Sequence, residues 1–449
     1  MCSIFTTNKK IDDEILHDNL LERRGPDQTN IVKQDEYIFA HYLLSMTGQH
    51  TVQPIIDNNI ICLFNGEIYN YLENSNYESD IFKIIEEYKN NKEQFVKNLD
   101  GEFAIVLFDF SKNICYFSTD AFGIKPLYVS IEDKEFGICS YKEPLIKSGF
   151  KNIFRCEPNS LYKMDLTDIS FSKISEVHTF DLNQHKNNFN DWNNAFLKSI
   201  EKRFKNTKYD IILPLSSGHD SGIIACAFDL LDIDFTSFSF IGQENIDILE
   251  QRIDKRKEKS IFHSNQIIVK DRISEIDRLK IKEFINNNCA FFSYGADLDF
   301  KNHNHIGIND PGAHGLTFIL NYVKNINPNI RILASGHGGD EITTNLQNYK
   351  FGKPNPACFE KDLVSIFPWE NFYYGTQSSY ISKEESISGG FGIEGRYPLL
   401  DKQVVQEYLW LTPELKNKYY KAPITNFMLE NNYPVSVGDP SNFKRGFNV

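Results

Sequence analysis

The chain has 449 residues, of which 41% are hydrophobic and 24% are charged, as in an ordinary globular protein. Its length exceeds that of one ordinary core, so we expect two domains. The formal net charge of −13 argues against a nucleic-acid partner, because phosphate binding requires a basic face. A small anionic substrate needs only a local positive site and stays compatible with this charge.

The beginning of the chain lacks the basic segment and apolar run of a secretory signal. No stretch approaches the roughly 20 apolar residues of a membrane span. We therefore expect a cytoplasmic protein without a membrane partner. The eight cysteines include no CxxC pair, which argues against a zinc or redox motif.

Short apolar runs between turn residues predict that the first third of the chain is rich in strands. A stripe of apolar residues at helical spacing, residues 81–88, predicts a helix after the start signal Ser79-Asp80. Strands with helices on their outer faces are typical of a two-layer sandwich. The predicted strands cover residues 37–40, 60–64, 103–108 and 114–117.

A polar stretch over residues 183–190 predicts a linker, so we expect one domain over residues 1–180 and a second over 190–449. After the linker, strands and helices are predicted to alternate. This alternation is typical of a parallel sheet with covering helices. The predicted elements are a helix over residues 192–204, a strand over 209–215, a helix over 222–228 and a strand over 236–241.

Cys2 differs from the other cysteines by its position. Removal of Met1 would leave its α-amine beside its thiol. An α-amine titrates near about 7.7–8.0, so much of it accepts a proton at neutral pH. The amine would then serve as a general base for the nucleophilic sulfur.

Five motifs follow Cys2 in a fixed order and, with it, resemble the glutaminase domain of class II amidotransferases. The order and spacing are similar to those of the glutamine-hydrolysing asparagine synthetases, over roughly residues 1–160. This resemblance implies an N-terminal-nucleophile αββα sandwich. The motifs are Arg24-Gly25-Pro26-Asp27, Asn65-Gly66-Glu67-Ile68-Tyr69-Asn70, Ser79-Asp80, Leu99-Asp100-Gly101-Glu102-Phe103-Ala104 and Gly123-Ile124-Lys125-Pro126-Leu127-Tyr128.

The resemblance implies that Cys2 attacks the side-chain amide of glutamine. Asn65 and Gly66 would form the oxyanion hole, since an amide side chain and a backbone N–H are suitable donors for a tetrahedral oxyanion. Asp80 would hold the α-amine of glutamine, and Glu67 belongs to the same glutamine-binding set. Asn-Gly also favours a hairpin turn, and both interpretations can hold at once.

Leu43 departs from the family pattern. The family usually has an arginine in an HxRLS segment that grips the α-carboxylate of glutamine, and leucine cannot make that charge-assisted contact. Three alternatives stay open: another cation such as Arg24 takes the role, glutamine binds weakly, or free ammonia is the nitrogen source.

The predicted strand ending at Leu215 leads into Ser216-Ser217-Gly218-His219-Asp220-Ser221 and then a helix. Hydroxyls and free N–H groups at a helix N-terminus make an anion site, although Ser and Asp also favour an ordinary N-cap. The segment resembles the SGGxDS loop of ATP pyrophosphatases, with Ser217 in place of a glycine. His219 fills a variable position, where we expect a structural role.

A second segment, Ser335-Gly336-His337-Gly338-Gly339-Asp340-Glu341, resembles the SGxGxDE motif of the same family. The resemblance implies that Asp220 and Asp340 share a Mg2+ ion on the pyrophosphate side of ATP. Carboxylate oxygens together with substrate phosphates suit this metal. The implied ATP-binding residues are Leu215, Ser216, Gly218, Asp220, Ser221, Phe240, Ser335 and Gly336.

The segment from Gly390 to Asp401 resembles the GxEARxPFLD segment of asparagine synthetases. Lys444 begins a motif, Lys-Arg-Gly-Phe, whose lysine in the family contacts the acyl-adenylate. Together these motifs imply a doubly wound α/β ATP-pyrophosphatase domain over residues 190–449.

His337 stands where asparagine synthetases usually carry glutamate and β-lactam synthetases carry tyrosine. Its imidazole suits proton transfer near neutrality, so we hypothesise that His337 and Glu394 act on the amine or ammonia nucleophile. A structural histidine is the equally weighted rival.

The leading hypothesis is an ATP-dependent ligase whose small-molecule partners are glutamine, ATP and a carboxylate acceptor. Aspartate is the acceptor that the resemblance implies, and a sugar acid or secondary metabolite competes with it. The alternatives are a β-lactam- or lasso-type cyclase forming an intramolecular amide and a non-catalytic nucleotide-binding homologue. A homodimer is one assembly that the sequence leaves open.

Overall fold

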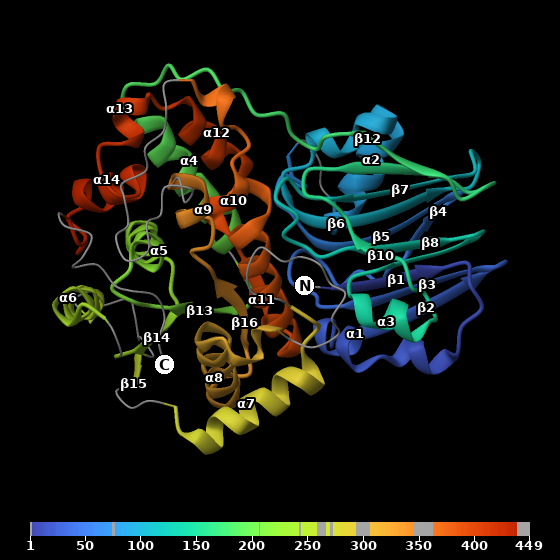
Figure 1. Ribbon diagram of the computed structural model, residues 1–449, viewed down its shortest axis with the longest axis horizontal. Helices are drawn as coiled ribbons and strands as arrows, with labels where there is room; N and C mark the ends of the chain where they lie inside the picture. Colours follow the sequence, from blue (N-terminus) through green and yellow to red (C-terminus); the bar gives the residue numbers. More distant parts are fainter. Residues whose placement is uncertain are drawn as a thin grey trace.

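Two six-stranded antiparallel sheets form the N-terminal part of the molecule, shown at the right in Figure 1. The computed structural model describes residues 2–73, 77–205, 207–241, 244–257, 266–269, 273–292, 306–344 and 362–437. The first sheet has the order β10-β8-β9-β1-β3-β2. Its strands are β1 Ser3–Thr7, β2 Gln28–Gln34, β3 Tyr37–Leu43, β8 Tyr128–Glu132, β9 Glu135–Cys139 and β10 Ile153–Arg155.

The second sheet has the order β12-β11-β7-β6-β5-β4. Its strands are β4 Ile55–Asp57, β5 Ile60–Ile68, β6 Gly101–Asp109, β7 Ile114–Thr119, β11 Leu161–Asp165 and β12 Phe171–Ser175. The helices of this part are η1 Asp13–His17, α1 Asn19–Arg24, α2 Ile81–Asn91, η2 Lys92–Asn98 and α3 Lys142–Lys147.

Strand β6 has a continuously apolar sequence because both of its faces are covered. Ala104, Val106 and Phe108 belong to the core between the two sheets. The alternate residues Phe103, Ile105 and Leu107 belong to a second core with α2 and η2 on the outer face. Helices α1 and α3 contribute to the core of the first sheet in the same way. Because successive side chains point to opposite faces, a strand covered on both sides must be apolar throughout. The predicted αββα layering is confirmed.

A five-stranded parallel sheet of order β15-β14-β13-β16-β17 forms the C-terminal part, at the left in Figure 1. Its strands are β13 Asp210–Pro214, β14 Thr236–Phe240, β15 Gln266–Val269, β16 Ile330–Ala334 and β17 Glu394–Arg396. The longer helices are α4 Asn190–Phe204, α5 His219–Leu230, α6 Ile246–Lys257, α7 Glu275–Asn288, α8 Pro311–Ile326, α11 Gly375–Gly390, α12 Lys402–Trp410 and α14 Ala422–Glu430. The shorter ones are η3 Ile306–Asn309, α9 Gly339–Thr343, η5 Leu363–Ser365, α10 Glu370–Tyr373, η6 Pro398–Leu400 and α13 Pro413–Lys416.

Helices cover both faces of this sheet. Ile211 and Leu213 of β13 pack in the core that contains α4, α5, α12 and α14. Ile212, on the opposite face of the same strand, packs in the core that contains α7 and α8. The predicted doubly wound architecture is therefore confirmed. Such sheets bind ligands at the carboxyl ends of their strands, which is where the loops after β13 and β16 lie.

Buried ion pairs join the two parts of the molecule. Glu385 of α11 contacts Arg24 Nη2 at 2.7 Å and Lys125 Nζ at 3.1 Å, and all three side chains are at most 1% exposed. Arg203 of α4 similarly contacts Glu102 of β6 at 2.8 Å. The motifs around Arg24, Glu102 and Lys125 thus lie at the junction.

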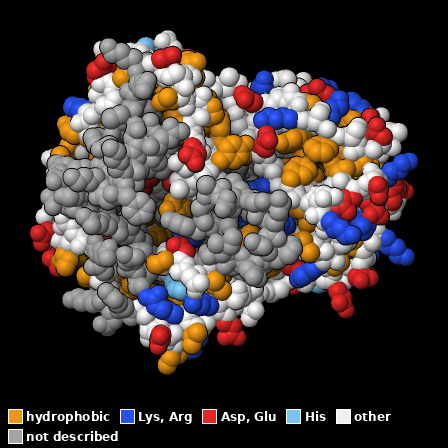
Figure 2. All heavy atoms as spheres, viewed as in Figure 1, with side chains coloured by type: hydrophobic (Ala, Val, Ile, Leu, Met, Phe, Trp, Pro, Cys, Tyr) orange, Lys and Arg blue, Asp and Glu red, His pale blue; other side chains and the backbone are white. Residues whose placement is uncertain are grey.

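Charged side chains of both signs are interspersed over the N-terminal sheets at the right of Figure 2. Among the residues that the structure describes, no helix has the length and apolar character needed to cross a membrane.

Candidate active sites

Cys2 directly precedes β1 and is 6% exposed. Its Sγ accepts a hydrogen bond from Leu44 N at 3.5 Å, and its carbonyl oxygen accepts one from Arg24 Nε at 2.8 Å. Burial raises the pKa of the Cys2 thiol to about 11. Because such a thiol is protonated at neutral pH, it requires a base before it can act as a nucleophile.

Asn65 lies opposite Ala104 in the pairing of β5 with β6 and is fully buried. Neither Oδ1 nor Nδ2 of its side chain has a hydrogen-bond partner among the described residues. A buried amide without partners is costly, so this side chain is suited to bind a ligand. The alternative interpretation of Asn65-Gly66 as a hairpin turn is wrong, because both residues lie inside β5.

Gly66 has a φ of +138°, and a Cβ atom here would lie 1.9 Å from the carbonyl oxygen of Glu102. Only glycine fits this backbone conformation and this close approach. The Asn-Gly pair is therefore required by a distorted strand, which places the Asn65 amide and the Gly66 backbone in adjacent positions.

Glu67 and Asp80 are two further buried carboxylates of this site. Asp80 Oδ2 accepts a hydrogen bond from Ile68 N at 3.0 Å, and the Thr47 hydroxyl donates to Glu67. Burial, with a smaller contribution from the negative charge of Glu394, raises the pKa of Glu67 to about 8 and that of Asp80 to about 7. Both carboxyls are thereby brought into the physiological range of titration.

Arg24 is not free to replace the missing arginine at position 43. Its side chain is fully buried and donates to the Cys2 carbonyl, the Tyr141 hydroxyl at 2.8 Å and Glu385 Oε2 at 2.7 Å. A glutamine carboxylate would have to displace a buried ion pair. These contacts therefore argue against the alternative that Arg24 grips the α-carboxylate.

Glu394 of β17 lies closer to the Cys2 site than its motif suggested. It is fully buried and accepts a hydrogen bond from Arg396 Nε at 2.7 Å, while Arg396 Nη2 lies 3.8 Å from Glu67 Oε2. Burial alone would raise the pKa of Glu394, but nearby cations, including Arg396 and Lys125, lower it well below its ordinary value. Glu394 is therefore ionised, and through Arg396 it is linked to Glu67 of the N-terminal part.

The loop after β13 is organised by its own hydroxyls. Ser216 and Ser221 are joined through their Oγ atoms at 2.8 Å, and Gly218 N donates to Ser216 Oγ at 3.1 Å. Ser217 N donates to the carboxylate of Glu244 at 2.6 Å. The loop thus already holds an anionic group, as a phosphate-binding loop at the start of α5 would.

Arg252 of α6 supports this loop and was not singled out in the sequence. Its Nη1 donates to the carbonyl oxygens of Ser216 and Gly218, at 2.5 and 2.8 Å. A single arginine in an amphipathic helix carries no sequence signal for this role. The hydrophobic residues assigned to the nucleotide, Leu215 and Phe240, are both buried at the ends of β13 and β14.

Asp220 and Asp340 converge on one cation, the ammonium of Lys421. Lys421 Nζ lies 2.6 and 2.7 Å from the two oxygens of Asp220 and 2.9 Å from Asp340 Oδ1. Two carboxylates aimed at one point fit Mg2+, which binds to one or two carboxylates together with substrate phosphates. Lys421 would have to move for the metal to bind there.

The glycines of the second loop allow the two loops to approach. A Cβ at Gly336 would lie 2.5 Å from Asp220 Cβ, and one at Gly339 would lie 2.1 Å from Asp220 Oδ1. The SGxGxDE pattern is therefore explained by close packing against Asp220. Ser335 lies in the same loop, where its Oγ accepts a hydrogen bond from His337 N at 3.2 Å.

His337 stacks on Tyr380 and Tyr397, with ring centroids 5.3 and 6.3 Å away. Its Nε2 lies 3.3 Å from Glu384 Oε1, so the carboxylate beside the imidazole is Glu384 and not the predicted Glu394. Glu384 lies beside Glu385 on α11 and carries no motif of its own.

His219 and Lys444 are the two remaining residues that the sequence singled out. His219 is buried against Tyr420, and burial lowers its pKa to about 3, as fits the structural role expected for it. Lys444 lies outside the described residues.

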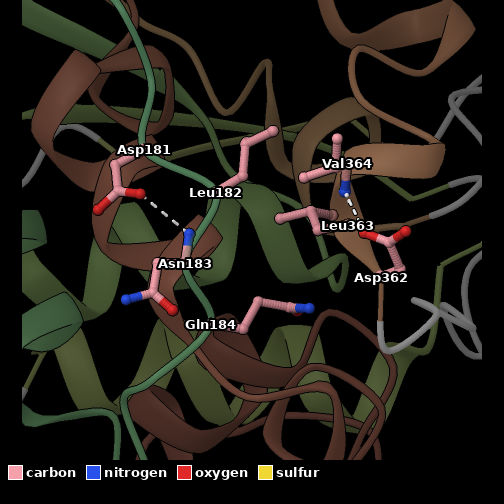
Figure 3. Close-up of a pocket in the computed structure, with 7 residues that line it drawn as sticks. All are labelled: Asp181, Leu182, Asn183, Gln184, Asp362, Leu363 and Val364. Carbon is pink, nitrogen blue, oxygen red and sulfur yellow. Dashed lines mark hydrogen bonds between the residues drawn. The ribbon is translucent and has the colours of Figure 1, made fainter.

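A surface depression of about 480 Å3 is lined by none of these residues (Figure 3). The carboxylates of Asp181 and Asp362 are turned toward the backbone N–H groups of Asn183 and Val364, at 3.0 and 3.1 Å. Both acids are therefore engaged with backbone N–H groups of their own segments. Its lining residues are Asp181, Leu182, Asn183, Gln184, Asp362, Leu363 and Val364.

Comparison with known proteins agrees with this geometry. A family model described as a glutamine amidotransferase domain matches residues 1–181. A putative glutamine-hydrolysing asparagine synthetase of Methanocaldococcus jannaschii is 25% identical, over 88% of this chain and 77% of that protein. A probable one of Acanthamoeba polyphaga mimivirus is 25% identical, over 93% and 78%, and asparagine synthetase 2 of Bacillus subtilis is 22% identical, over 82% and 52%. The chain is therefore similar to glutamine-hydrolysing asparagine synthetases over most of its length, and its residues 1–181 match the glutamine amidotransferase domain.

Proposed function

We propose that this protein is an ATP-dependent ligase that hydrolyses glutamine at Cys2 and joins the ammonia to an activated carboxylate, with AMP as a product. One observation carries the proposal. The Asn65 amide, which has no hydrogen-bond partner among the described residues, lies in the same fold unit as Cys2, and the convergent carboxylates Asp220 and Asp340 lie in the other. We assign residues 1–180 to the glutaminase and 190–449 to the synthetase.

In the glutaminase, the α-amine of Cys2 would take the thiol proton after removal of Met1. The sulfur then attacks the amide carbon of glutamine, and the Asn65 amide and Gly66 N–H would stabilise the oxyanion. The carbon–nitrogen bond breaks, and ammonia leaves with the transferred proton. Water hydrolyses the thioester to glutamate and regenerates Cys2, while Asp80 holds the α-ammonium group and Glu67 lines the site.

In the synthetase, Mg-ATP supplies the adenylyl group that activates the carboxylate. The N–H and hydroxyl groups of the loop 216–221 would hold the phosphates, with Leu215 and Phe240 toward the base. Asp220 and Asp340 would hold the metal. Lys421 would leave the carboxylates and neutralise phosphate charge instead. His337, Glu394 and Lys444 stay predicted participants in amide formation.

Aspartate is the acceptor suggested by the names of the relatives, and another carboxylate, such as a sugar acid, is the alternative. His337 with Glu384 is the feature that favours testing other acids, because it gives this site an imidazole–carboxylate pair between two tyrosine rings. The ammonia would pass through the interior between the two sites.

The test is to incubate the protein with ATP, Mg2+ and a panel of acids, with either glutamine or ammonium chloride. AMP and pyrophosphate release that depends on one acid, with an amide as product, supports the ligase. Loss of glutamate release in Cys2→Ala with retained ammonium-driven activity supports the two-site scheme. The absence of acid-dependent AMP release with every acid in the panel would contradict the proposal.

A further inference from the structure

Glutamine brings two opposite charges to the Cys2 site. Asp80 can pair with its α-ammonium group, and the α-carboxylate requires a cation of its own. Three cations near the site are already engaged with buried carboxylates: Arg24 with Glu385, Lys125 with Glu385, and Arg396 with Glu394. Removing a buried charge from its partner is costly, so none of these cations is suited to bind the substrate.

Lys208 is in a different situation. It follows α4, it is exposed, and its Nζ donates to Ser45 Oγ at 3.2 Å. Ser45 follows Leu44, whose N–H contacts Cys2 Sγ, and is two residues beyond Leu43. The ammonium of Lys208 therefore contacts Ser45, the residue directly after the one whose N–H contacts the Cys2 sulfur.

The spacing fits glutamine. The amide carbon and the α-carboxylate of glutamine are separated by four bonds, or about 5 Å, which is comparable with the step between neighbouring residues. A glutamine whose amide lies at Cys2 Sγ can therefore direct its carboxylate toward Ser45 and Lys208.

The charges around Lys208 leave its ammonium available. Asp27, which accepts a hydrogen bond from Ser45 N at 2.9 Å, is paired with Arg331 through two contacts of 2.8 Å. The ring of Tyr209 lies 5.5 Å from Lys208 Nζ and 4.7 Å from Arg331 Cζ. Within the described ranges Lys208 contacts a neutral hydroxyl and an aromatic face and pairs with no carboxylate.

We propose that Lys208 binds the α-carboxylate of glutamine and supplies the positive charge that Leu43 does not. The inference rests on the proposed glutamine hydrolysis at Cys2. Lys208 comes from the C-terminal part of the chain, whereas Cys2, Asn65 and Asp80 come from the N-terminal part. The glutamine site is then complete only when the two parts are joined.

The experiment measures the KM for glutamine in the full chain, as glutamate release, for Lys208→Met and Lys208→Arg. Lys205→Met is the matched control, because Lys205 is an exposed lysine on the same segment that pairs with Glu201. The α-methyl ester of glutamine is the second substrate, since it keeps the amide and the α-amine but lacks the carboxylate charge.

We expect Lys208→Met to raise the KM for glutamine roughly tenfold or more, the size of a charge-assisted hydrogen bond, with little effect on the ester. Lys208→Arg should retain most of the affinity, and Lys205→Met all of it. Equal KM values for glutamine in wild type and Lys208→Met, or equal losses for glutamine and the ester, would overturn the inference while leaving glutamine hydrolysis intact. Absence of glutamate release from the wild-type protein would instead overturn the proposed function, and the inference with it.

Discussion

At the scale of single residues, the proposed glutamine site contains carboxyl groups held near their titration points. Asp80 has a pKa raised to about 7, chiefly by burial. Its folded pKa lies above the ordinary value, so the protonated form predominates below pH 7 and the carboxylate above it. Only the carboxylate can pair with the α-ammonium group of glutamine.

We therefore expect the KM for glutamine to fall as the pH rises from 6 to 8. Asp80→Asn should bind glutamine more weakly and lose this dependence, because its side chain carries no charge at either pH. The measurement is steady-state glutamate release across this range. A wild-type KM that does not change with pH would show that Asp80 is not the titrating partner.

His337 keeps its predicted role, but the carboxylate that lies beside it is Glu384. If the imidazole moves a proton from the attacking nitrogen, His337→Ala should lower ammonium-dependent AMP release about 100-fold, with glutaminase activity unaffected. His337→Gln, which keeps a polar side chain of similar reach, is the control for packing between the two tyrosines. Wild-type turnover in His337→Ala would leave a structural role only.

The motifs in the sequence predicted Cys2, Asn65, Asp220 and Asp340 as site residues, because each belongs to a local pattern. The sequence did not point to Lys421, Arg252, Glu384 or Lys208, which contact the candidate site segments, since each is a single charged residue in an ordinary stretch. Their roles come from contacts with residues that are distant in sequence. Such contacts depend on the packing of the whole fold, which local spacing does not encode.

At the scale of elements, hydrophobic periodicity predicted strands and helices where both faces are covered. The predicted helix over residues 81–88 is α2, and the predicted strand over residues 209–215 contains β13. The interpretation of Asn65-Gly66 as a turn is wrong for a physical reason. Asn-Gly favours a turn in isolation, but here β5 continues through it, paired with β6 over its whole length.

Gly66→Ala tests this distorted strand. The added Cβ meets the carbonyl oxygen of Glu102 at a position of positive φ, so we expect a loss of about 3 kcal/mol or more in the free energy of unfolding. Gly149→Ala is the matched control, because Gly149 also has a positive φ, +84°, but no atom closer than 4.0 Å to the added Cβ. Thermal unfolding of both variants separates the two effects. Equal losses would mean that backbone conformation alone, and not the contact with Glu102, requires glycine at position 66.

At the scale of the whole molecule, Glu385 connects the two parts by binding Arg24 and Lys125 of the N-terminal part. Glu385→Gln would leave two buried cations without their shared carboxylate. We expect a loss of about 3–5 kcal/mol, the cost of breaking a buried ion pair from one side. Glu384→Gln, one residue away, is the control. Urea unfolding of the two variants measures the difference, and equal stability of Glu385→Gln and wild type would mean that these charges contribute nothing to the joined state.

The joined state also bears on the proposed function, because Arg396 of the parallel sheet, which pairs with Glu394, contacts Glu67 of the proposed glutamine site. The measurement that tests the central claim most directly follows the nitrogen itself. The protein is incubated with amide-labelled nitrogen-15 glutamine, excess unlabelled ammonium, ATP, Mg2+ and the acceptor acid. A product amide with more label than the ammonium in solution is the predicted result, with an unlabelled amide from Cys2→Ala. A product whose label only matches that of the free ammonium would contradict the account, because the two sites would then not be coupled.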